Sequence, residues 1–152
     1  MVLKKTLCFL IILISFAWFP HSLQNNIDLG YCWDIYYEAG RGNFTEGWLY
    51  NDAVGFIFKP FAEFSYPVAF GIWYSLGVMV WLSFMWHYPI VGLMAFYPIL
   101  LALEIGQIDP VLAWLCLTPL GSVLAACIKP YCLLFVVFHA WRIKKGNSAK
   151  LL

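Results

Sequence analysis

The stretch from Tyr66 to Trp86, YPVAFGIWYSLGVMVWLSFMW, decides the fold class because it contains no aspartate, glutamate, lysine or arginine. A helix of roughly 20 apolar residues is what the ~30 Å hydrocarbon core of a bilayer requires. The segment therefore predicts a membrane-spanning helix over residues 66–86.

The whole chain shares this apolar character: it has 152 residues, of which 63% are hydrophobic, 20% aromatic and 11% charged. Soluble chains average about 25% charged residues, and a soluble domain of this size needs polar surface that this composition does not supply. A disulfide-rich secreted miniprotein, a disordered tail and a free cytosolic enzyme are excluded. We expect an all-α integral membrane protein whose residues 1–152 form a single membrane domain.

Upstream of residue 66, an apolar run at 6–23 follows Lys4 and Lys5, which predicts an uncleaved signal anchor. Residues 24–65 are the only long polar stretch and form the expected outer loop. Within that loop, residues 31–39 have aromatic and polar side chains at helical spacing before Gly40. We therefore expect a short amphipathic helix at the membrane surface after the first span.

Downstream, residues 89–104 predict a third span, and residues 108–142 are interrupted at Thr118-Pro119 and Lys129-Pro130. The last segment is too long for one span and too short for two, at about 20 residues each. Two interpretations stay open here: broken helices that re-enter the membrane, or a single kinked span. Either one gives about four net crossings.

The charges indicate how the chain is oriented. All eight acidic residues lie between Asp28 and Asp109, whereas both ends carry only basic residues. We expect the protein in the plasma or inner membrane. Because lysine and arginine concentrate on the cytoplasmic side of a membrane protein, we expect both termini in the cytoplasm. The loop 24–65 then lies outside. The sequence has no basic patch interleaved with aromatic residues, so we expect no nucleic-acid partner.

Few charged residues follow the second span, and these are the candidate functional groups. Ionisable groups are costly at membrane depth unless they line a wet cavity. In the re-entrant arrangement, Lys129 returns to the outer level and shares a cavity with Glu104, Gln107 and the acidic loop. Such a cavity suits a substrate with an anionic phosphate and hydroxyl groups. In the alternative, Glu104 is interfacial and Lys129 extends its ammonium group to the membrane surface.

Several short motifs follow one another in a recognisable order. They are Asp34-Ile35-Tyr36-Tyr37-Glu38-Ala39, Gly47-Trp48-Leu49-Tyr50, the aromatic-proline block 56–61, Gly106-Gln107 and Ile128-Lys129-Pro130-Tyr131. Over residues 5–145 the chain resembles the N-terminal part of the GT-C fold glycosyltransferases that use polyprenol-phosphate sugars, nearest to the mannosyltransferase-like glycosyltransferase family 87. It departs from the family pattern at Phe58-Lys59-Pro60, where a Tyr-Pro-Pro-like block is usual. The further spans of the family do not follow, so we expect a minimal relative, one part of a split enzyme, or a remnant.

The resemblance implies roles for individual residues. Asp34 matches the general base of the first outer loop, and Lys129 would bind the leaving phosphate. Gln107 would hydrogen-bond the sugar or phosphate, with Glu104 beside it. Tyr36, Tyr37 and Tyr50 would orient the sugar, although packing at the membrane interface is the alternative for each ring.

The expected partners are the bilayer and a polyprenyl-phosphate sugar, with a hexose, mannose by resemblance, passing to an outward-facing acceptor. The carboxylates of the outer loop permit a divalent cation, but no ligand spacing predicts a metal site. The alternative function is a non-catalytic membrane protein that assembles with itself or with a larger C-terminal partner subunit.

Overall fold

The computed structural model describes residues 2–45, 48, 54–94 and 96–148, and every regular element within these ranges is a helix. By its internal contacts the chain falls into two compact units, Met1–Pro110 and Val111–Leu152. Each unit is described by itself below. Tyr50, one of the predicted sugar contacts, lies outside the described residues.

Two helices of the described residues are long and apolar enough to cross a membrane, α1 (Val2–Leu29) and α4 (Tyr66–His87). Helix α4 coincides with the predicted span 66–86. Helix α1 continues past the predicted end at residue 23 through six further residues to Leu29. It does so because polar side chains of its last turns bind the end of α6 (Phe96–Glu104).

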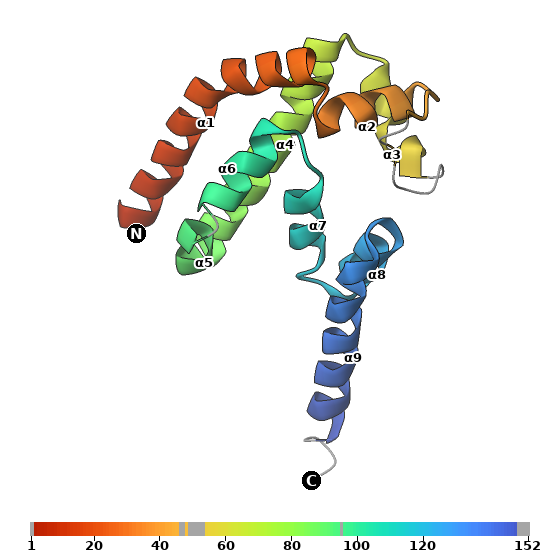
Figure 1. The fold of residues 1–152 in the computed structure, drawn as a ribbon. Coiled ribbons are helices and arrows are strands. Elements are labelled where there is room, and N and C mark those ends of the chain that lie inside the picture. Colours follow the sequence, from red (N-terminus) through yellow and green to blue (C-terminus); the bar gives the residue numbers. More distant parts are fainter. Residues whose placement is uncertain (1, 46–47, 49–53, 95, 149–152) are drawn as a thin grey trace. The chain divides into compact units, whose positions relative to one another are not determined.

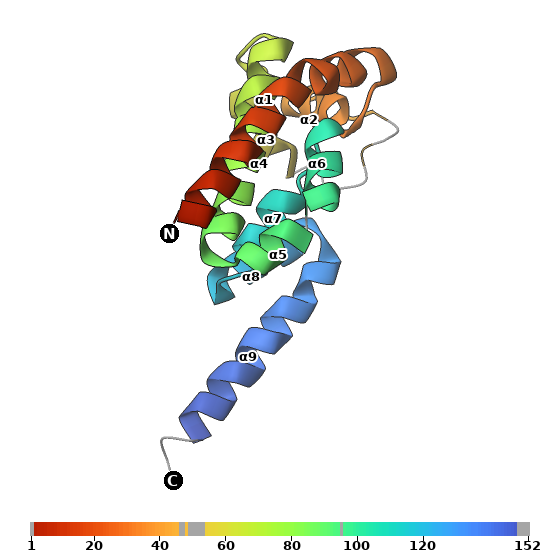
Figure 2. The same ribbon diagram turned by 90° about the vertical axis from the view of Figure 1, so that its left-hand side faces the viewer.

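Helices α1 and α4 run antiparallel and side by side (Figures 1 and 2). At one end of the pair, Lys4 Nζ donates a hydrogen bond of 3.0 Å to the Trp86 carbonyl near the end of α4. Further along, the Tyr74 hydroxyl donates to the Ser15 carbonyl at 3.0 Å, and Phe19 stacks on Phe70. These contacts fix the register of the two candidate spans.

The predicted third span is occupied by α5 (Pro89–Met94) and α6. Trp81 Nε1 donates to the Gly92 carbonyl at 3.3 Å, which ties α5 to α4. Helix α6 packs against α1, as Figure 2 shows. The first unit is therefore built around three neighbouring apolar segments.

Two short helices, α2 (Cys32–Gly40) and α3 (Gly55–Ala62), lie in the segment predicted as the outer loop. Helix α2 covers nearly the predicted range and ends at Gly40. Its buried face is aromatic and centres on the fully buried Trp33, whose ring contacts those of Tyr37, Phe58, Phe61, Phe70 and Trp73. This cluster joins α2 to α3 and to the start of α4.

The end of the chain forms α7 (Asp109–Leu115), α8 (Pro119–Ile128), the 3-10 turn η2 (Pro130–Cys132) and α9 (Leu133–Ser148). The helix breaks lie at the two predicted positions. Thr118 Oγ1 accepts a hydrogen bond of 3.1 Å from the Gly121 amide and so caps α8. His139 Nε2 lies 3.0 Å from the Cys116 carbonyl and joins α9 to the chain after α7.

Candidate functional site

The candidate site begins at Asp34, in the first turn of α2 directly after α1. The Asp34 side chain is neither buried nor fully exposed. A carboxylate is favourable in a first helical turn because the amide groups there carry partial positive charge. The Asp34 carboxylate is therefore partly dehydrated but still accessible from solvent.

The surroundings of Asp34 alter its basicity. Burial raises the pKa of the Asp34 carboxyl above its usual value, and the negative charge of Glu38, one helical turn later, raises it further. A carboxylate with a raised pKa holds an abstracted proton more firmly than an ordinary one does. Such tuning is what a general base at neutral pH requires.

The turn at residues 105–107 lies against the first turn of α2. The Trp33 amide donates to the Ile105 carbonyl at 3.3 Å, and Trp73 Nε1 donates to the Gly106 carbonyl at 2.9 Å. Gln107 Nε2 lies 3.8 Å from Cys32 Sγ. The structure thus brings Gln107 to the same end of α2 as Asp34, although 73 positions separate them in the sequence.

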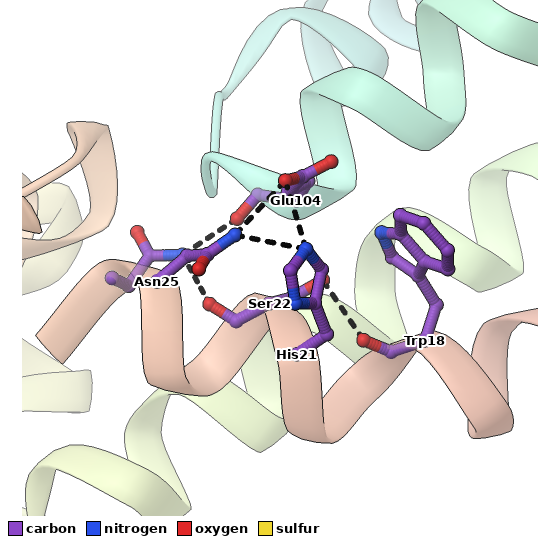
Figure 3. A network of polar contacts seen from close by, with 6 residues as sticks. Trp18, His21, Ser22, Asn25 and Glu104 are labelled. Carbon is purple, nitrogen blue, oxygen red and sulfur yellow. Dashed lines mark hydrogen bonds and ion pairs between the residues drawn. The ribbon is translucent and has the colours of Figure 1, made fainter. Parts of the chain in front are cut away.

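Glu104 is bound to α1 by a polar network (Figure 3). Its Oε1 accepts a hydrogen bond of 3.0 Å from Asn25 Nδ2 and lies 3.5 Å from His21 Nε2. The backbone carbonyl of Glu104 accepts a hydrogen bond of 2.6 Å from Asn26 Nδ2. These contacts hold the end of α6 and therefore the turn that follows it. Glu104, which the resemblance places beside the substrate, contacts α1 through its carboxylate in this structure.

The α1 side of this network was not predicted from the sequence. Ser22 and Asn26 are fully buried, and the Asn26 amide also donates to the Ser22 carbonyl at 2.8 Å. Polar residues at positions 21, 22, 25 and 26 repeat on one helical face. That pattern was the available signal that α1 continues and pairs with another polar segment.

Tyr36 and Tyr37 are 3% and 8% exposed. The Tyr36 ring stacks on Phe58 with 4.7 Å between ring centroids, and the Tyr37 hydroxyl donates to the Phe64 carbonyl at 2.8 Å. Both rings thus pack α2 against neighbouring segments.

Lys129 lies in the second unit, where it ends α8. Its backbone is extended, its amide donates to the Ala125 carbonyl at 2.8 Å, and its carbonyl accepts from the Cys132 amide at 3.0 Å. Within the first unit, the predicted site residues Asp34 and Gln107 lie at the same end of α2.

Arg41 and the exposed Lys59 line a hollow of about 370 Å³ between α2 and α3. Arg41 Nη1 lies 3.3 Å from Glu38 Oε1 on the same helix, so part of its charge is already balanced. Among the described residues, no group of three or more histidine, cysteine, aspartate or glutamate side chains is placed to hold a metal ion.

No family model, curated protein or solved structure matches this chain.

Proposed function

We propose that this chain is an integral membrane glycosyltransferase, or the N-terminal part of one. It transfers a hexose, mannose by resemblance to glycosyltransferase family 87, from a polyprenyl-phosphate donor to an outward-facing acceptor. The observation that supports this most is the position of Asp34, partly buried in the first turn of the helix after α1 and beside the turn that carries Gln107.

In the proposed reaction, the acceptor hydroxyl attacks the anomeric carbon while Asp34 takes its proton. The bond between the anomeric carbon and the phosphate oxygen breaks, and the polyprenyl phosphate leaves with the electron pair. The configuration at the anomeric carbon is inverted, and no covalent intermediate between sugar and enzyme forms. The raised pKa of Asp34 favours this proton transfer.

Two further residues complete the proposed chemistry. Gln107 donates a hydrogen bond to the sugar or the phosphate. Lys129 stabilises the charge that develops on the leaving phosphate, where a fixed cation is most effective.

The proposal includes a topology with about four net crossings, made by α1, by α4, by α5 with α6, and by residues 108–142, which either re-enter through α7 and α8 before α9 crosses or form one kinked span. The 28 residues of α1 rise about 42 Å, more than the ~30 Å hydrocarbon core. Its polar last turns therefore extend into the outer headgroup region. A fluorescent protein fused after Leu152 should be fluorescent, since this topology places the C-terminus in the cytoplasm, and one inserted in the outer loop should not. Fluorescence of the loop fusion but not of the C-terminal fusion would contradict the topology.

The activity is tested with the purified chain in liposomes, a polyprenyl-phosphate donor carrying a radiolabelled hexose, and a panel of acceptors. The assay is run with the chain alone and with the product of the adjacent gene. We expect label to pass to an acceptor with wild type and not with Asp34→Asn. Absence of transfer by wild type in both configurations would rule out the proposal.

A second candidate function is a non-catalytic membrane protein that assembles with itself or with a larger partner. The specific observation that favours it is that Tyr36, Tyr37 and Glu104 are all occupied by contacts within the chain. In that case, alanine at Asp34 and at Gln107 should leave both the cellular phenotype and the size of the purified complex unchanged. A loss of phenotype with a normally sized complex would favour the enzyme.

A further inference from the structure

An open apolar groove of about 790 Å³ runs between α1 and α4. Large side chains such as Phe16, Ile72 and Met79 form its walls. Gly71 and Ser75, one helical turn apart, leave space between them, and the Ser75 hydroxyl donates to the Gly71 carbonyl at 2.7 Å. Neither the glycosyl-transfer chemistry nor the polar network of Figure 3 uses this surface.

The depth of the groove restricts what can occupy it. Both walls belong to the two helices able to cross a membrane, so in the proposed topology the groove lies within the hydrocarbon core. An occupant there must be apolar along its length. A free carbohydrate or a phosphate group does not meet that condition.

The size of the groove favours a hydrocarbon chain over a helix of a second copy. An α-helix with its side chains is about 10–12 Å wide, so this volume holds fewer than about two turns of one. The groove follows α1 from Ile12 to Phe19 and α4 from Val68 to Met79. A flexible chain fills such a long, narrow space without leaving its walls unpacked.

The charge beyond the Ile12 end of the groove indicates the headgroup. Ile12 and Lys5 are seven residues apart, so they share one face of α1 at a rise of about 10 Å. Lys5 is exposed, and neighbouring Lys4 bonds the Trp86 carbonyl near the end of α4. A positive charge therefore lies in line with the groove at the level of a lipid headgroup.

We propose that the groove binds one acyl chain of an anionic phospholipid whose phosphate contacts Lys5. The lipid belongs to the leaflet that faces the N-terminus. This inference rests on the membrane insertion in the proposed function, and it does not depend on sugar transfer.

The test is native mass spectrometry of the purified full chain, delipidated in detergent and incubated with phosphatidylglycerol or phosphatidylcholine of identical acyl chains. We expect about fivefold more retained phosphatidylglycerol than phosphatidylcholine, the ratio that one lysine near a headgroup provides. Ser75 is exposed and lines the groove, so Ser75→Leu should fill the groove and abolish retention of both phospholipids. Lys5→Gln should lower phosphatidylglycerol retention to that of phosphatidylcholine.

Gly71→Leu provides a second, independent obstruction of the groove. Leu13→Phe is the matched control, since Leu13 is exposed on α1 and does not line the groove; it should retain both lipids like wild type. Far-ultraviolet circular dichroism verifies that each variant keeps its helices.

Three results would overturn the proposal. The first is equal retention of the two phospholipids by wild type, and the second is retention that Ser75→Leu and Gly71→Leu leave unchanged. The third is displacement of the phospholipid by another occupant, either polyprenyl phosphate added as a competitor or a second copy of the chain in a dimer. None of these results depends on the glycosyl-transfer assay, so the two proposals can fail separately.

Discussion

Replacing Gly106 with alanine should destabilise the first unit by about 2–5 kcal/mol. Gly106 has a φ of +69°, a conformation that costs an L-residue about 1–2 kcal/mol. A Cβ atom there would also lie 2.5 Å from Trp33 Cβ and 3.2 Å from Trp33 Cα. Relieving that overlap requires a backbone shift, and overpacking of this kind costs about 1–3 kcal/mol.

Gly42→Ala is the matched control. Gly42 has a φ of +85°, but an added Cβ there would meet nothing within 4 Å. It should therefore cost only the conformational part, about 1–2 kcal/mol. The free energy of unfolding of each variant is measured in mild detergent by titration with a denaturing detergent, followed by circular dichroism.

The difference between the two variants isolates the contact between the 105–107 turn and Trp33. If Gly106→Ala and Gly42→Ala destabilise the protein equally, this turn does not pack on α2 as described. The placement of Gln107 at the same end of α2 as Asp34 would then lose its structural basis.

Three further substitutions have expected outcomes. Asn26→Ala removes the donor to the Glu104 carbonyl and should lower the unfolding free energy by about 1–3 kcal/mol, measured by the same titration. Trp73→Phe removes the bond to the Gly106 carbonyl and should cost a similar amount, with a transfer rate that falls alongside stability. Asp34→Asn should raise the thermal unfolding midpoint at neutral pH, because burial and Glu38 disfavour the ionised carboxylate in the folded state. That advantage over wild type should shrink as the pH falls through the raised pKa, where the wild-type carboxyl becomes neutral; an advantage that persists at low pH would contradict the cause given.

Much of the fold could be predicted because its signals are local. The absence of charge over residues 66–86 fixes α4 almost to the residue, and Gly40 ends α2 as expected. Thr118 followed by Pro119 separates α7 from α8 through a cap that is visible in the sequence. In each case the decisive residues lie within a few positions of the boundary that they set.

The end of α1 could not be predicted in the same way. Residues 24–28 look like the start of a polar loop, yet Asn25 and Asn26 remain helical because their partner is Glu104. That partner is more than 75 residues away, so no local pattern contains the information. The apolar run alone predicts that the first helix ends at residue 23.

The sequence nominates residues for the candidate site but does not give their surroundings. Asp34 and Gln107 could be selected from motifs, whereas their shared location depends on the packing of residues 105–107 against Trp33. For Tyr36 and Tyr37, the aromatic spacing was evident. Whether the rings face a substrate or the protein is decided by α3 and α4, which supply their neighbours.

The most direct measurement compares the initial rates of hexose transfer by Asp34→Asn and Asp28→Asn in the same liposomes. Asp28 is an exposed carboxylate at the end of α1 that accepts a hydrogen bond of 2.7 Å from Gln24. If Asp34 is the general base, its amide variant should lose about 10²–10⁴-fold in rate while Asp28→Asn stays close to wild type. Equal rates for the two variants, with transfer by wild type established, would contradict the role of Asp34.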